Sequence, residues 1–453
     1  MEQKSATISQ RGTRLRFFAH GAIPATLLLL SLFLLWPPSL RAEEAYTFDP
    51  AEIEKKPYQF GGYVEAKPTL STPRTDSAIY RIKFADRDLG KSLEEANLKL
   101  QFEGSYEKGM SRLYFKTNTD YLISRLGDRE STDLFEGYLS LKPSSSWRID
   151  AGKKTFKWGK GYAWNPAAFI DRLKDPDDPE VGMEGIFALS ADYTKSFDGP
   201  LKTVSFTPVL QPVYDHINAE FGQKDYVNLA GKLYLLWYDT DIDLIFLTDG
   251  SRTTRYGADF SRNIGTNLEI HGEIAYIRDF QANRVSRSGR ITPVEYDATS
   301  YLLGTRYLTA RDTTYILEYY RNGTGFSRSE MEDFFGFVND AFRTFTATGN
   351  DAALNRAAQL FEGQYGRPNA MRDYLYLRIS QKEPFDILYF TPALTTILNL
   401  NDRSYTISPE AAYTGITNLD LRLKASFIDG PKESEYGEKP FNFKIEMRVG
   451  YYF

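Results

Sequence analysis

The sequence predicts an all-β fold: a transmembrane antiparallel β-barrel of about eighteen strands, with small helices in one long external loop. Three observations lead to this prediction. Apolar and polar residues alternate along many segments, tight turns alternate with longer polar connections, and only one long apolar stretch is present. Because that stretch, Ala25 to Trp36, lies close to the N-terminus, a bundle of membrane helices is not expected.

Composition narrows the class of protein further. The chain of 453 residues has 15% aromatic residues, no Cys and a net charge of -5. The aromatic content argues against disorder, and the lack of Cys excludes a disulfide framework, a thiolate zinc site and a Cys nucleophile. Because the acidic balance is not that of a nucleic-acid binder, we expect no nucleic-acid partner. We also expect no cofactor and no metal, although the acidic run Asp171 to Glu180 leaves Ca²⁺ binding open.

The N-terminal segment, residues 1–42, has the pattern of a secretory signal peptide. A basic start at Arg11 to Arg16 precedes the apolar stretch, a proline pair ends it, and Ser39 to Ala42 offers a cleavage site. A retained N-terminal anchor is the alternative. We expect residues 43–57 to form a short periplasmic arm and residues 58–453 to form an outer-membrane β-barrel.

The clearest alternation lies at the C-terminus. One face there is wholly apolar, consisting of Phe441, Phe443, Ile445, Met447, Val449, Tyr451 and Phe453. The residues between them include Lys444, Glu446 and Arg448, so a core on both faces of this strand is excluded. The apolar face must therefore be buried or face lipid. Similar alternation recurs in residues 95–103, 112–118, 135–142, 268–276 and 419–427.

The connections set the strand count. Longer polar connections are expected near residues 71–92, 125–133, 157–182, 214–225, 280–296, 322–371 and 430–439. Outer-membrane barrels have short periplasmic turns and longer external loops. If residues 78–86 formed a strand, the count would be nineteen and the 157–182 connection would be periplasmic. Leaving them in the first loop gives about eighteen strands, with both termini periplasmic.

Only residues 322–371 show helical spacing over a long region. Phe334, Val338 and Phe345 follow it after Ser329-Glu330-Met331-Glu332, which fits a capping box. A second short helix is expected from Ala352 to Phe361. The region could cover the barrel mouth or fold inward as a constriction, and the sequence leaves both open.

A closed barrel follows from the chemistry of lipid, because backbone groups in hydrocarbon must all be hydrogen-bonded within the protein. The chain resembles bacterial outer-membrane β-barrel proteins in its leader, its alternation and its last strand, which ends Gly450-Tyr451-Tyr452-Phe453. Tyr451 and Phe453 are similar to the signal read by the barrel-assembly machinery. The resemblance implies an outer-membrane location, with outer-membrane lipid and that machinery as partners.

A narrower resemblance rests on the run from Gly152 to Gly161, which contains Trp158-Gly159 and is followed by Asn165-Pro166. It is similar to an uncharacterised group of porin-like barrels and implies no established substrate. By analogy with porins of this size, a homo-oligomer is possible.

Charged residues predicted to face inward are the main functional candidates. The predicted pore-lining residues are Lys99, Arg112, Lys116, Glu136, Arg148, Lys154, Glu269, His271, Glu273, Arg422, Lys424, Lys444, Glu446 and Arg448. Opposed rows of opposite charge create a field across a narrow pore, which sorts polar solutes. Alternatively, such charges pair across neighbouring strands and only stabilise the wall.

The predicted function is a porin or channel for passive or substrate-selective passage of small hydrophilic solutes. One alternative is a barrel that transports apolar solutes or serves in an export or assembly complex. A set of phenylalanines keeps it open: Phe334, Phe335, Phe337, Phe342 and Phe345. A second alternative is a barrel-embedded hydrolase centred on His271, beside Glu269 and Glu273. No serine partner is indicated for it, so an enzyme is not expected.

Overall fold

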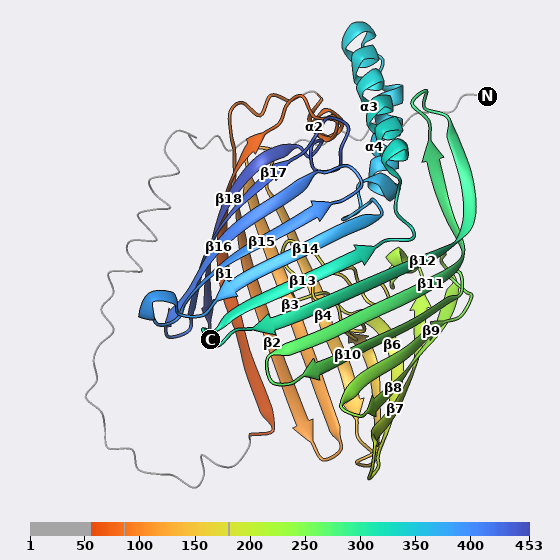
Figure 1. Cartoon of the computed structure of the whole chain (residues 1–453), viewed down its shortest axis with the longest axis vertical. Helices are drawn as coiled ribbons and strands as arrows, with labels where there is room; N and C mark the ends of the chain where they lie inside the picture. Colours follow the sequence, from red (N-terminus) through yellow and green to blue (C-terminus); the bar gives the residue numbers. More distant parts are fainter. Residues whose placement is uncertain (1–55, 86, 180–181) are drawn as a thin grey trace, which may run out of the picture. The chain divides into compact units, whose positions relative to one another are not determined.

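Alternating residues suit a wall with lipid on one side and polar groups on the other. The computed structural model describes residues 56–85, 87–179 and 182–453. Over these residues, eighteen antiparallel strands close into one barrel, in which β1 (Tyr58–Pro73) pairs with both β2 (Leu93–Lys108) and β18 (Phe441–Tyr452) (Figure 1). The predicted fold class and strand number are confirmed. The expected signal peptide and most of the expected arm lie outside the described residues.

The other strands follow one another around the barrel in sequence order. They are β3 (Ser111–Ser124), β4 (Arg129–Leu141), β5 (Trp147–Lys154), β6 (Ile186–Ser196), β7 (Leu201–Val213), β8 (Tyr226–Trp237), β9 (Thr240–Leu247), β10 (Arg255–Ile264), β11 (Leu268–Val285), β12 (Ile291–Leu308), β13 (Thr313–Arg321), β14 (Asp373–Gln381), β15 (Phe390–Asn399), β16 (Tyr405–Ile416) and β17 (Leu419–Asp429). Connections after odd-numbered strands lie at one end of the barrel, which we call the loop end. Those after even-numbered strands lie at the other, the turn end.

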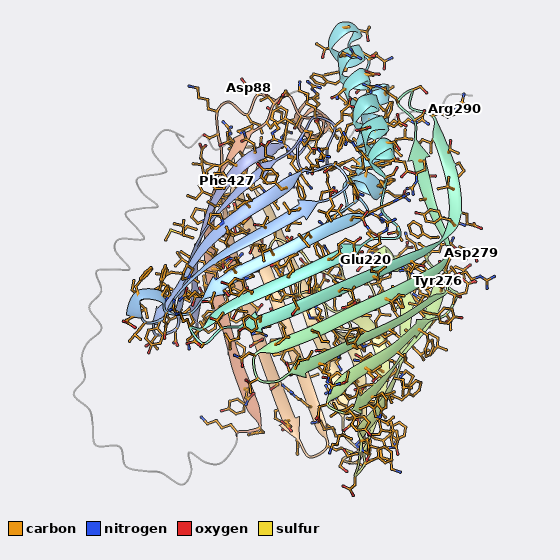
Figure 2. The ribbon with its side chains drawn as sticks, in the orientation of Figure 1. Asp88, Glu220, Tyr276, Asp279, Arg290 and Phe427 are labelled. Carbon is orange, nitrogen blue, oxygen red and sulfur yellow. The ribbon has the colours of Figure 1, made fainter. Side chains whose placement is uncertain are left out.

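The two faces of the wall differ in polarity. Met447, Tyr276 and Phe427 are exposed on the outer face, and Figure 2 labels the last two. Asp243 and Glu273 are buried on the inner side. This is the reverse of the polarity of a soluble barrel, so the outer band is suited to lipid.

The C-terminal residue helps to close the barrel. The N–H of Phe453 donates to the carbonyl of Gly62 at 3.0 Å, and the N–H of Gly62 donates to the carbonyl of Phe453 at 3.1 Å. The ring of Phe453 packs edge-on against Phe102, with centroids 5.7 Å apart. The last residue thus joins the first and last strands at the turn end.

Helices gather at the loop end (Figure 1). They are α2 (Ala78–Phe84), α3 (Arg328–Thr348) and α4 (Ala352–Leu360), with the short helical turns η2 (Ala219–Phe221) and η3 (Phe361–Tyr365). A further short turn, η4 (Pro384–Asp386), lies at the turn end. Phe334 and Phe335 are fully buried in a cluster with Phe326 and Tyr365. Among the described residues, no helix is long and apolar enough to cross a membrane.

Residues 280–296 were predicted to form a polar connection, and this prediction is wrong. Strands β11 and β12 continue through this segment as a hairpin with only residues 286–290 between them. Pairing runs without a break from Phe280↔Tyr296 to Val285↔Ile291. The segment has no continuous apolar face because the hairpin projects past the other strands, so its sequence resembles that of a loop.

Two local predictions also need correction. Residues 78–84, which the sequence assigned to the first loop, form α2, although they add no strand, as expected. The N-cap of α3 is Ser327, whose side chain accepts the N–H of Glu330, rather than Ser329. Inside the barrel, the ring of Tyr320 stacks on that of Trp164.

Candidate functional site

The described residues of the connection between β5 and β6, 155–179 and 182–185, fold into the barrel. The sequence predicted a long connection at residues 157–182, and the structure places its described part inside the barrel. The first part of this segment contacts the inner wall from β7 to β13, and residues 175–178 reach the opposite wall at β17 and β18. We call the whole segment the inner loop.

A carboxylate inside the inner loop fixes its first turn. The side chain of Asp171 accepts the N–H groups of Phe156 at 3.0 Å, Lys157 at 3.1 Å and Trp158 at 2.7 Å. Burial raises the pKa of the Asp171 carboxyl above its ordinary value, while these three hydrogen bonds act in the opposite direction. The acidic residue thus has a structural role in holding the turn together.

An apolar cluster attaches the inner loop to one side of the wall. Trp158, Phe169 and Ile170 are buried against inner-face residues of β7 to β9, including Val209 and Ile245. Burying such side chains stabilises the contact by about 1.5–3 kcal/mol each. Part of the inner face is therefore apolar, where the inner loop packs on it.

Two wall carboxylates hold the backbone of the inner loop. Glu273 on β11 accepts the N–H groups of Lys160 and Gly161 at 2.6 Å each, and that of Ala167 at 3.1 Å. Glu318 on β13 accepts the N–H of Ala163 at 2.9 Å and also that of Tyr162. Both carboxylates are almost completely buried. Since hydrogen bonds to charged groups contribute about 1.5–3 kcal/mol each, these contacts hold the segment firmly.

The Trp158-Gly159 motif allows this close approach. Gly159 has a φ of 90°, and a Cβ there would lie 2.8 Å from an oxygen of Glu273. The next residue, Lys160, extends its Nζ to 3.0 Å from Asp243 and 3.9 Å from Asp259. The motif that resembles porin-like barrels therefore forms the contact between the inner loop and the wall.

The far part of the inner loop is held by basic residues. Lys424 on β17 donates to the carbonyl of Asp177 at 2.6 Å, and Arg448 on β18 pairs with Asp178 at 2.7 Å. Arg448 also lies 3.7 Å from Glu65 on β1. The inner loop therefore crosses the lumen from wall to wall.

A polar cavity of about 550 Å³ lies between residues 175–178 and 182 of the inner loop and the inner faces of β1–β3 and β16–β18. We call it the wall cavity. Its lining runs from Asp420, near the turn end, to Ile428, near the loop end. Seven of the predicted pore-lining residues line it: Lys99, Lys116, Arg422, Lys424, Lys444, Glu446 and Arg448.

The other predicted charges lie elsewhere on the wall. Arg148 and Lys154 both pair with Asp150 on β5, and Glu136 accepts the N–H of Thr155 at 2.9 Å. Arg112 is exposed near the turn end. Some of the charges predicted to line a pore therefore form pairs within the wall, as the alternative interpretation expects.

The three residues of the hydrolase alternative occupy a covered part of the wall. His271 donates or accepts at 2.8 Å with Glu318 and lies 3.6 Å from Glu269, while Glu273 lies beneath the inner loop. The ring of His271 lies over Gly304, where a Cβ would be 2.1 Å from Nε2. In the described part of the chain, no serine hydroxyl hydrogen-bonds to His271.

Sequence reasoning missed Glu318. Glu318 follows Thr314 and Ile316 on the inner face of β13. The sequence marked it only as the one carboxylate among uncharged inward-facing residues of that strand. The sequence could not reveal its partners, because they lie on a connection that is distant along the chain. No group of His, Asp and Glu among the described residues has the arrangement of a metal site.

Comparison with known proteins gives a likeness in fold. No protein-family model matches the chain, and no curated protein matches it either. Among solved structures, Acinetobacter baumannii OccAB1 aligns with a TM-score of 0.50 at 9% identity, over 87% of this chain and 96% of that one. Pseudomonas aeruginosa OprD aligns with a TM-score of 0.48 at 9% identity, over 87% of this chain and 93% of that one. The likeness to OccAB1 shows that this chain has the fold of porin-like outer-membrane barrels.

Proposed function

We propose that the protein is an outer-membrane channel through which small hydrophilic solutes diffuse passively. The observation that carries this proposal is the wall cavity, a polar space bounded by the inner loop on one side and charged strands on the other. A barrel of this strand number is wide enough to hold an aqueous path narrowed by a loop. The loop end then faces outward and both chain ends face the periplasm.

The wall side of this path is predominantly basic, although Glu65, Asp420 and Glu446 also lie there. Lys67, Lys116 and Lys444 project from the wall without an ion pair to any described residue, whereas Asp175 and Asp177 come from the inner loop. Their opposition supports a field across the path that orients polar solutes. We therefore propose selection by charge and size, with ions of both signs able to pass.

The test is single-channel recording of the purified mature protein in a planar bilayer, with a salt gradient across it. We expect stable stepwise openings and a small reversal potential, because both signs of charge line the path. Heat-modifiable migration on a gel first establishes that the barrel is folded. A folded protein that produces no openings would refute the proposal.

Cellular location and partners follow from the same proposal. We propose export across the inner membrane, assembly by the barrel-assembly machinery, and residence in outer-membrane lipid, with a homo-oligomer possible. The exposed aromatic and aliphatic outer band supports the lipid contact. Separation of inner and outer membranes by density tests the location.

No specific observation favours the alternatives. The phenylalanines that kept an apolar path open do not line the wall cavity, since Phe334, Phe335 and Phe337 are buried among the helices. His271 lies between carboxylates beneath the inner loop. The proposed channel therefore performs no chemical step.

A further inference from the structure

A second cavity, of about 530 Å³, lies on the loop-end side of the inner loop. We call it the vestibule cavity. Aromatic side chains form much of its surface, among them Trp164, Phe169 and Phe280. Its volume lies within the range of about 300–1,000 Å³ that is typical of small-molecule sites.

Arginines without carboxylate partners face this cavity. The guanidinium of Arg255 lies 6.0 Å from the ring centroid of Phe169, and its Nε is buried without a hydrogen-bond partner. Within the described part of the chain, this side chain makes no ion pair and no hydrogen bond. Arg252 donates only to carbonyl oxygens, at 3.5 Å to Phe169 and at 3.0 Å to Glu220.

The carboxylates at the cavity are already engaged. Asp171 accepts three N–H groups of the inner loop, and Glu220 pairs with Arg172 at 2.7 Å. Arg367, on the other side of the cavity, hydrogen-bonds the carbonyl of Thr324 and leaves its Nε without a partner. The lining therefore carries positive charge that the described acidic groups do not neutralise.

Burial destabilises the charged forms of these basic side chains, because it removes them from water. It lowers the pKa of Arg252 to about 10 and the pKa of Lys174 below its ordinary value. A buried charge is stabilised when an opposite charge enters beside it, so an anion in this cavity would offset the cost of desolvation. Arginine also offers a planar pair of donors that matches a carboxylate.

We propose that the vestibule cavity binds a small organic anion that joins a carboxylate to a flat apolar body. Arg252 and Arg255 hold the carboxylate, and the rings of Trp164, Phe169 and Phe280 contact the body. This names a substrate class for the proposed channel and rests on that function for its part in uptake. Binding itself requires no open channel.

Calorimetric titration of the purified, folded, full-length mature protein with benzoate tests the proposal. Benzamide serves as the neutral probe of the same shape, and acetate as the anion without the apolar body. We expect benzoate to bind at least about tenfold more tightly than either, because the neutral probe lacks the charge-assisted hydrogen bonds. Equal binding of benzoate and benzamide, or no binding of benzoate, would overturn the proposal.

Variants locate the site. Arg255→Gln and Arg252→Gln should each weaken benzoate binding about tenfold, since each removes a charged donor. Arg311→Gln, at an exposed turn-end position, removes the same charge elsewhere and should leave binding unchanged. Arg255→Gln that folds and binds benzoate as the parent does would contradict the assignment. Benzoate binding by a protein that is silent in bilayers would refute the channel and leave this site standing.

Discussion

Glu273 attaches the inner loop to the wall at strand β11. Its two carboxylate oxygens accept three N–H groups from the inner loop, and the side chain is buried. Leaving one buried donor unpaired costs about 1–3 kcal/mol. The inner loop therefore has few alternatives to its present path while this carboxylate is present.

Glu273→Ala should release the inner loop from β11 and produce larger or noisier single-channel openings. The three N–H groups lose their acceptor, so the folded state should lose about 3 kcal/mol or more, with a lower unfolding temperature. Glu130→Ala, at an exposed position of β4, is the matched control. Openings identical to those of the parent would show that Glu273 does not position the inner loop.

Gly159 permits the same contact through its backbone. Gly159→Ala should disturb conductance as Glu273→Ala does, because the new methyl group would meet the carboxylate at 2.8 Å and φ is 90°. Gly265→Ala isolates the backbone strain, of about 1–2 kcal/mol, because φ is 70° there with no atom within 4 Å. Single-channel recordings of both variants test this prediction. Equal changes in conductance for Gly159→Ala and Gly265→Ala would argue against a steric role of Gly159.

Among the strands, β18 closes the barrel by pairing with β1. Deletion of Phe453 removes both backbone hydrogen bonds to Gly62 and the contact with Phe102. We expect less folded barrel in the outer membrane and a lower unfolding temperature. Phe453→Ala keeps the backbone pair and should have a smaller effect on stability. Both are measured by heat-modifiable migration of membrane fractions, and wild-type levels of folded deletion variant would contradict this role.

Elements differ in how far the sequence predicts them. The alternation of β18 identifies a strand at once, because one face meets lipid and the other does not. The extension of β11 and β12 escapes prediction, because its outer residues Gln281 and Asn283 are exposed and polar, and its buried residues Ala282 and Val285 are too few to form an apolar stripe. The inner loop is visible as a long connection. Its inward path depends on Glu273 and Glu318, which contact it only after the barrel has closed.

At the scale of the whole molecule, the predominantly basic wall of the wall cavity faces acidic residues of the inner loop. Lys116→Glu or Lys444→Glu should shift the reversal potential toward cations, since each removes an unpaired positive group from the wall cavity. Lys108→Glu, in the exposed β2–β3 turn, makes the same change outside that cavity. If all three variants shifted the potential equally, the effect would come from net charge rather than from the path.

The sequence predicted the inward faces more fully than it predicted the candidate site. Lys99, Lys424 and Arg448 were found by alternation alone, since a period of two assigns faces. Glu273 was assigned to the same face, but the inner loop covers it. Alternation does not report depth along the barrel or what lies against the wall, which only tertiary contacts determine.

The most direct test of the central claim uses the lack of Cys in the chain. Ser426→Cys places one thiol in the wall cavity, and Ser145→Cys places one at an exposed turn position as control. A charged thiol reagent is added during single-channel recording, and labelling is verified by mass. The account predicts a stepwise fall in conductance for Ser426→Cys and none for the control. Full labelling of Ser426→Cys with unchanged conductance would contradict a path through the wall cavity.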